Sequence, residues 1–386
     1  MKSQEVKNFF LIWLLGFFTS YARSVFYPLI PLLVQELRLS FSQVGALTSV
    51  THTMYALLQL PCGYLTDRVG FKRTMTGGAI ISILGLALGS VSIDYSTILV
   101  AQALIGIGGA VSLTPAISAV AAMFTKTRRG FAEGLLLSHI TASVAFSLLV
   151  GGLLAETFSW RSVYAIATIL MVTTMLLFAM LVREPPTSRR SNMDLRMMSK
   201  ILNSNSLLLI TCITTEVIGF QAMLTYVPKY LVDAGGLTPG AAASLTALAY
   251  LTAMVSRPLI GRTSDFVGRK PMIIATMLTG SAFFYLLMLN PSDLLIETTL
   301  FICWGLTFNG MYPVAVALIT DVSERELRGL MVGLVTSTST FIGGLLQERI
   351  GFMIDVFGYQ AFFTVLALVP AIGSFLCIPV KEAKKP

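Results

Sequence analysis

The sequence predicts an all-α integral membrane protein with twelve membrane-spanning helices. Of its 386 residues, 55% are hydrophobic and 12% are charged, whereas an average soluble domain is roughly 25% charged. Twelve runs are long and apolar enough to cross a bilayer, which takes about 20 helical residues. A soluble enzyme, a nucleic-acid-binding module and a secreted disulfide scaffold are therefore excluded.

The expected spans follow one another along the whole chain. None alternates apolar and polar residues as a membrane strand does, so each is expected to be helical. The spans are 8–34, 42–66, 74–92, 96–123, 132–155, 161–182, 205–232, 239–261, 271–289, 294–320, 329–347 and 359–380.

The basic residues predict the orientation. Most of the 27 lysines and arginines fall in alternate connections, which the positive-inside rule assigns to the cytoplasm. We therefore expect a multi-pass protein of the cell membrane with both termini cytoplasmic. The net charge of +8 is interpreted as a topology signal, not as a footprint for nucleic acid.

The chain repeats itself. GYLTDRVGFKR begins at Gly63 and GRTSDFVGRK begins at Gly261, an offset of 198 residues. Because each half holds an even number of spans, the two copies share one orientation, and such parallel repeats place a substrate site between the halves at the membrane midplane. We expect six-helix bundles at 1–182 and 205–386, joined by a cytoplasmic linker at 183–204 and sufficient as a monomer.

The paired loops carry a recognisable motif. Asp67 is an anion at a helix end that can pair with an arginine or cap a helix in one conformation and release it in another, so the loop is interpreted as a gate; a topology anchor is the alternative. GxxxDRxGxKR resembles the signature loop of the major facilitator superfamily, which implies its transporter fold over the whole chain. The motif residues are Gly63, Asp67, Arg68, Gly70, Lys72 and Arg73, then Gly261, Asp265, Gly268, Arg269 and Lys270, with Phe266 where an arginine would stand.

Two departures from that family count against a multidrug antiporter of the usual type. Gln102 stands where many proton-coupled relatives carry an arginine in the fourth helix. The stretch Ser138–Gly152 in the fifth span has no proline and so lacks the Gly-Pro-Gly-Gly pattern that is usual in drug antiporters.

Arg23, near the middle of the first span, is the leading candidate for substrate binding. A charge inside a membrane is a functional candidate by default, and the two-pronged guanidinium suits a carboxylate or phosphate. Tyr27 lies one turn away and could shape the same pocket. A structural bond from Arg23 to a carbonyl group or to Glu216 is the alternative.

A second arginine, Arg257, lies in the eighth span. The repeat relates its helix to the second span, so the polar stripe of His52, Tyr55 and Gln59 matches that of Tyr250 and Arg257. Both stripes are expected to face the central cavity.

The stretch VSRPLIG around Arg257 resembles helix 8 of the oxalate:formate antiporter and monocarboxylate transporter families, which implies that this arginine binds a carboxylate. Ala253 replaces the aspartate of the monocarboxylate family, and Leu330–Leu346 lacks the lysine of the oxalate family. Snorkelling of Arg257 to the cytoplasmic side is the alternative.

Two further groups are candidates for proton coupling. Glu216 is an acid deep in the seventh span, where Gln221 pairs by repeat with Arg23, and a fixed ion pair of Glu216 with Arg23 is the alternative. His139 in the fifth span is the other candidate, with packing as its alternative role. Asn309 in the tenth span completes the set of substrate-binding candidates.

The leading functional hypothesis is a secondary transporter that moves a small organic anion, such as a carboxylate, by alternating access, with protons or a counter-anion as coupling partner. An exporter of neutral or cationic solutes, drugs or sugars, is the alternative. A membrane enzyme or non-transporting sensor is disfavoured, because no nucleophile, acid pair or metal cluster is evident. The four cysteines stand singly in apolar runs, so no disulfide, metal or cofactor is expected.

Overall fold

The computed structural model describes residues 3–124, 126–183, 204–289, 293–323 and 327–380, and within these ranges it holds helices and short connections without a strand. The predicted linker, 183–204, lies almost entirely outside the described residues. The chain forms two compact units. Unit 1 comprises 1–39, 46–192 and 239–244, and unit 2 comprises 40–45, 193–238 and 245–386.

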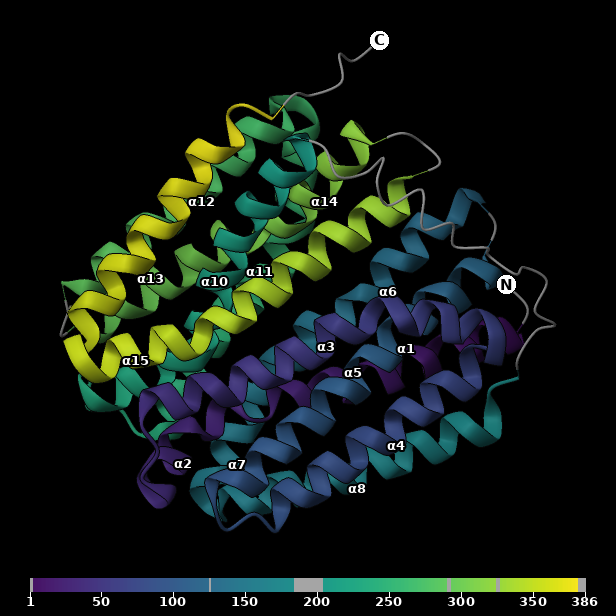
Figure 1. Cartoon of the computed structure of the whole chain (residues 1–386), viewed down its shortest axis with the longest axis horizontal. Coiled ribbons are helices and arrows are strands. Elements are labelled where there is room, and N and C mark those ends of the chain that lie inside the picture. The colour runs from purple at the N-terminus through teal and green to yellow at the C-terminus, as the bar shows by residue number, and fades with distance from the viewer. Residues whose placement is uncertain (1–2, 125, 184–203, 290–292, 324–326, 381–386) are drawn as a thin grey trace. The chain divides into compact units, whose positions relative to one another are not determined.

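Unit 1 is built from the helices of the first half of the chain (Figure 1). They are α1 Ser3–Ser24, η1 Tyr27–Leu29, α2 Ile30–Leu37, α3 Phe41–Val69, α4 Phe71–Ser90, α5 Tyr95–Met123, α6 Lys126–Phe146, η2 Ser147–Gly151, α7 Gly152–Thr157 and α8 Trp160–Leu181. The first expected span is broken by a 3-10 turn at η1, where Pro28 has no N–H to donate. The fifth contains the π-helical turn η2.

Unit 2 holds most of the second half. Its helices are α10 Ser204–Asp233, α11 Pro239–Val267, α12 Arg269–Met288, α13 Leu294–Leu306, η3 Phe308–Gly310, α14 Met311–Val322 and α15 Arg328–Cys377. The last two expected spans both lie in the stretch labelled α15, where a sharp turn at Gly358, with a φ of 75°, separates them. By length and composition, nine helices of the described part could cross a bilayer, with Leu330–Cys377 counted once.

Helix α8 shows the two-faced pattern that a bilayer requires. Its buried side chains recur every three to four residues and include Tyr164, Met171 and Phe178. On another face Ile169, Leu176 and Met180 are apolar yet exposed, Met180 by 79%. Apolar side chains on both faces are typical of a helix between protein and lipid, because in water such a surface would be a patch for association.

Glycines allow α4 to lie close to α5 within unit 1, and α4 also runs alongside α8 (Figure 1). A Cβ atom on Gly78 would lie 2.9 Å from the Gly108 carbonyl oxygen and 2.9 Å from Val111 Cβ. The adjacent Gly77 faces open space, with nothing within 4 Å of such an atom. The close position of α5, which carries part of the candidate site, therefore depends on the face of α4 that presents Gly78.

Two carboxylates related by the repeat cap helix starts, one in each unit. In unit 1 the Glu156 carboxylate accepts a hydrogen bond of 2.6 Å from the Gly240 N–H at the start of α11. In unit 2 the Asp355 carboxylate accepts bonds of 2.8 Å from the N–H groups of Phe41 and Ser42 at the start of α3. These first-turn donors have no partner within their own helix, so each carboxylate satisfies groups that the helix geometry leaves open.

We predict that Gly78→Ala lowers the melting temperature of the purified protein, whereas Gly77→Ala leaves it unchanged or raises it. Both changes gain about 1 kcal/mol of helix propensity, but only the Gly78 methyl group must displace α5, at a cost of roughly 1–3 kcal/mol. Thermal unfolding in detergent measures both variants. Equal shifts would show that the α4–α5 contact is not as tight as described.

Candidate functional site

In unit 1 the structure brings Arg23 of α1 onto the face of Tyr55 of α3. The guanidinium carbon lies 4.0 Å from the centre of the ring, a cation–π contact. Within the described residues Arg23 makes no hydrogen bond, and its buried Nε has no partner. A buried donor without a partner calls for an explanation, and a ligand that accepts hydrogen bonds would supply one.

Tyr27 and His52 join the same cluster. The hydroxyl of Tyr27, which lies in the 3-10 turn η1, is 2.9 Å from His52 Nε2. Tyr27 is 5% exposed and Tyr55 is 7% exposed. Gln59 lies one turn beyond Tyr55 on α3 and is half-buried. Two residues of the predicted α3 stripe therefore have partners here, His52 with Tyr27 and Tyr55 with the Arg23 charge.

On its other side Arg23 borders a small pocket between α1, α5 and α6. Gly109 of α5 makes room for the arginine, because a Cβ atom there would lie 2.7 Å from Arg23 Cδ. The pocket is lined by Arg23 together with Thr19, Ser20, Ser112 and His139 and by small or apolar residues. Hydroxyl, imidazole and guanidinium groups thus face one space.

In unit 2 Arg257 of α11 is held by Asn309. Its Nε donates to the Asn309 carbonyl oxygen at 3.2 Å, and its Nη2 donates to Asn309 Oδ1 at 2.9 Å. Asn309 lies in η3, the break between α13 and α14, and such a break leaves carbonyl groups free for other donors. Arg257 is thus tethered to a neighbouring helix.

Glu216 and Gln221 of α10 lie in the same unit and are 3% and 2% exposed. Glu216 lies within electrostatic range of Arg257. Its expected pairing with Arg23 would join the two units and stays a prediction. Gln221 Oε1 is buried without a partner, and Tyr250 of α11 packs edge-on against Phe220, with ring centres 5.5 Å apart.

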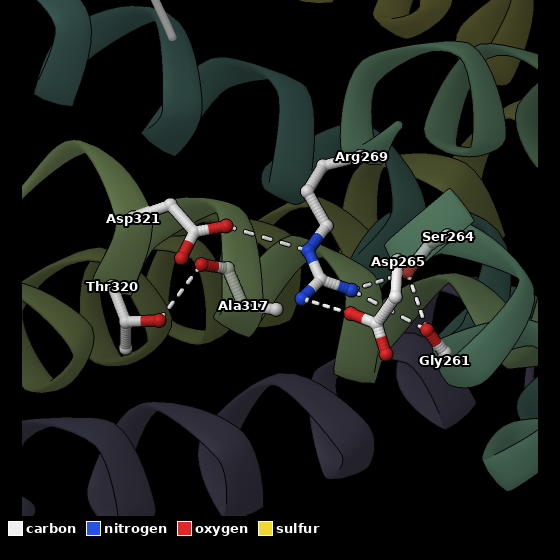
Figure 2. A network of polar contacts seen from close by, with 7 residues as sticks. All are labelled: Gly261, Ser264, Asp265, Arg269, Ala317, Thr320 and Asp321. Carbon is white, nitrogen blue, oxygen red and sulfur yellow. Dashed lines mark hydrogen bonds and ion pairs between the residues drawn. The ribbon is translucent and has the colours of Figure 1, made fainter. Parts of the chain in front are cut away.

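The second copy of the loop motif forms a network around Arg269 (Figure 2). Arg269 pairs with Asp265 at 2.6 Å and with Asp321 of α14 at 3.4 Å. Its Nη1 also donates to Ser264 Oγ at 2.5 Å and to the Gly261 carbonyl oxygen at 3.3 Å. This arginine therefore ties the end of α11 and the start of α12 to α14.

The first copy is arranged differently. Arg68 stacks on the Tyr64 ring at 4.5 Å, and within the described residues the carboxylate of Asp67 has no hydrogen bond or ion pair. Partial burial raises the pKa of Asp67 above its ordinary value. The sequence explains the contrast, because the arginine follows Asp67 by one residue, whereas Arg269 follows Asp265 by four and so reaches its own carboxylate.

Both copies turn through a glycine in the left-handed region. The φ angles are 93° at Gly70 and 109° at Gly268, conformations that residues with a Cβ atom rarely adopt. Lys270, beside the second turn, donates to the carbonyl oxygens of Ile378 and Val380 at 2.6 and 2.8 Å. Of the remaining motif residues in the first copy, Gly63 lies within α3, and Lys72 and Arg73 lie in the first turn of α4, with Arg73 exposed.

Several of these partners were not predicted from the sequence. Asp321 stands outside the motif, and its only signal is an acid at the end of a span. Ser112 and Gly109 lie in a run of small residues that predicts close packing but not a pocket. Gln102, noted as a departure, accepts from Thr51 Oγ1 at 2.9 Å and donates to the Tyr164 hydroxyl at 3.0 Å, which gives it a structural role.

Comparison with known sequences places this geometry in a family context. The chain matches the profile of the Major Facilitator Superfamily over residues 12–243 and 234–386. It is 24% identical over 383 residues to "Multidrug resistance protein MdtG" of Dickeya zeae (strain Ech586), covering 96% of this chain and 93% of the relative. It is 26% identical over 398 residues to the protein of that name from Yersinia enterocolitica, covering 98% and 94%.

Solved structures show the same fold. A bacterial homolog of the human lysosomal transporter Spinster, in an inward-facing and occupied conformation, gives a TM-score of 0.84 at 16% identity over 99% of this chain and 98% of that chain. A mutant of the nucleoside transporter NupG gives 0.83 at 11% identity over 97% and 100%. With its matching profile, its membrane-spanning helices and its repeated loop motif, the chain belongs to the Major Facilitator Superfamily and is a multi-pass membrane transporter.

Proposed function

We propose that the chain exports small organic anions by alternating access, with Arg23 as the group that binds the negative charge. The relatives named for multidrug resistance support export, which belonged to the alternative hypothesis, and they give no support to an anionic substrate. The anionic preference rests on one observation, the guanidinium of Arg23 stacked on Tyr55 with its buried Nε unpaired. A carboxylate, sulfonate or phosphonate would accept two of its donors in parallel.

The surroundings of Arg23 fit an amphipathic anion. The Tyr55 ring backs the guanidinium with an apolar surface, and the pocket on which Arg23 opens is lined by the hydroxyl-bearing Ser20 and Ser112 together with the apolar Leu113 and Ile140. Binding sites for small molecules combine such apolar walls with a few placed polar groups. A substrate that combines a planar aromatic ring with an acidic group would contact both the apolar walls and the polar groups.

Arg257 has a different part in this proposal. Because Asn309 already accepts hydrogen bonds from two of its nitrogens, Arg257 contributes its charge rather than a pair of parallel donors. It therefore favours an anion in unit 2 without being the main anchor. Glu216 moderates that charge, and a change in its protonation would alter the attraction.

A second candidate function is export of cationic compounds, with Glu216 as the counter-charge. The observation that favours it is the burial of this carboxylate in α10, at 3% exposure. In that case the two arginines would be structural.

We expect inside-out membrane vesicles that contain the protein to take up benzenesulfonate faster than vesicles without it, and Arg23→Gln to lower this uptake at least about tenfold, because a hydrogen bond to a charged group contributes roughly 1.5–3 kcal/mol. Arg23→Lys should restore part of the rate but not all, since an ammonium group lacks the planar fork. Radiolabelled benzenesulfonate suits the assay because it stays charged and does not cross lipid unaided.

Competition by isosteric compounds of other charge is the control. Benzamide is neutral and benzyltrimethylammonium is a permanent cation, so neither should compete with the anion. Uptake of the cation that depends on Glu216 and not on Arg23 would instead establish the second candidate function.

The two motif copies are proposed to act differently, the second as a brace within unit 2 and the first as the gate. We predict that Arg269→Gln lowers the melting temperature, because it removes two ion pairs that contribute at most about 1 kcal/mol each. Asp67→Asn should leave the melting temperature unchanged and alter the transport rate. Circular dichroism melts and vesicle uptake measure the two effects, and loss of stability in Asp67→Asn with none in Arg269→Gln would reverse the assignment.

A further inference from the structure

The pocket behind Arg23 has a histidine in its wall that the binding of an anion alone does not require. His139 of α6 is 2% exposed and lines the pocket together with Thr19, Ser112 and Arg23. It lies opposite Gly16 of α1, where a Cβ atom would come within 3.1 Å of His139 Nε2. The absence of a side chain at Gly16 therefore leaves that nitrogen facing the helix that carries Arg23.

The hydrogen bond of the other ring nitrogen fixes the tautomer. His139 Nδ1 lies 2.5 Å from the Leu136 carbonyl oxygen, and a carbonyl oxygen only accepts, so Nδ1 carries the hydrogen. In the neutral imidazole Nε2 then holds a lone pair. His139 can therefore receive a proton at the atom that faces the pocket without losing its existing hydrogen bond.

The charges around His139 decide when that proton is stable. Helix α1 contributes Arg23 and the phenol of Tyr21, and α6 itself contributes Glu133, nearly two turns earlier. Within the described residues, α5 and η2 place no titratable group at this depth. An imidazolium would thus share a poorly solvated space with the Arg23 cation, and the two charges repel each other. An anion bound to Arg23 removes most of that repulsion.

We propose that His139 is the proton-coupling residue of the anion site, so that binding of an anion to Arg23 is accompanied by protonation of His139 Nε2. The proton comes from the water that delivers the anion, an N–H bond forms on the imidazole, and no bond of the substrate breaks. When the anion leaves, repulsion from Arg23 returns the proton to the water. The loaded site then holds one anion and one added proton. Because their charges cancel, transport of a monovalent anion is electroneutral. This inference rests on the proposed function.

The chain has two histidines, and the other one fits this role less well. His52 Nε2 is already in contact with the Tyr27 hydroxyl at 2.9 Å. Its Nδ1 is buried without a partner, and His52 is not among the residues that line the pocket. A proton on His52 would therefore have to displace an existing contact or lie in an enclosed position.

The test is the affinity of the purified protein for benzenesulfonate between pH 5.5 and 8, measured by calorimetry. This probe stays anionic throughout, so any pH dependence belongs to the protein. Linkage of one proton predicts that the affinity rises as the pH falls, by up to about tenfold per pH unit. In two buffers of different ionisation enthalpy, the heats should report proton uptake on binding.

His139→Asn is the decisive variant, because its amide can still donate to the Leu136 carbonyl group but does not titrate. We expect its affinity to be independent of pH and to equal that of the unmodified protein at high pH. His139→Gln is a second variant should the first not fold. An unchanged pH dependence in both, or its loss in His52→Gln alone, would overturn the assignment to His139. Absence of benzenesulfonate binding at every pH would instead count against the proposed function itself.

Discussion

A positive charge inside a membrane protein costs free energy unless a neighbouring group compensates it, and this constraint shapes both units of the chain. Arg257 is compensated within the protein by two hydrogen bonds to Asn309, and Glu216 lies within electrostatic range of it. Arg23 is only partly compensated, because the Tyr55 ring contributes a cation–π contact of about 0.5–2 kcal/mol while the guanidinium donors stay without acceptors among the described residues. The different roles proposed for the two arginines follow from that contrast.

Small residues and helix breaks make the two arrangements possible. Gly109 lets the Arg23 stem lie against α5, and Gly16 gives His139 its place against α1. The 3-10 turn η1 presents Tyr27 to His52, and η3 presents the Asn309 carbonyl group to Arg257. In each case either a glycine provides the space that a neighbouring side chain occupies, or a break in a helix provides a group for hydrogen bonding.

Much of this architecture could be predicted from the sequence, because long apolar runs and a repeat of nearly constant offset can be recognised without knowledge of the packing. The repeat correctly pairs Gly70 with Gly268, which turn in the same way. The 3-10 turn after α1 and the break between α13 and α14 depend on packing against other helices and were not predicted, whereas the sharp turn at Gly358 in α15 falls between the last two expected spans. The contact of Arg269 with Asp321 was missed for the same reason, since the two residues are 52 positions apart.

The residues of the two charged clusters could be named from the sequence, but their partners could not. Tyr27 was expected beside Arg23, and His52 and Tyr55 on one stripe of the second span; in unit 1 the Tyr27 hydroxyl lies against His52 and the Arg23 guanidinium against Tyr55. The guanidinium group of Arg257 was expected to bind the carboxylate of a substrate. In the structure two of its nitrogens donate hydrogen bonds to Asn309. Periodicity identifies the face on which a residue lies, whereas the choice of partner depends on the backbone of another helix.

Thermal unfolding of the purified protein across a panel of anions, neutral sugars and amines tests the role of Arg23 most directly. An anion present at about 100 times its dissociation constant should add roughly 2.7 kcal/mol of stability if it binds only the folded state. We expect stabilisation by small aromatic or aliphatic acids that disappears in Arg23→Gln. Stabilisation by amines or sugars alone, retained in Arg23→Gln, would contradict anion binding at Arg23 and would make this arginine a structural residue.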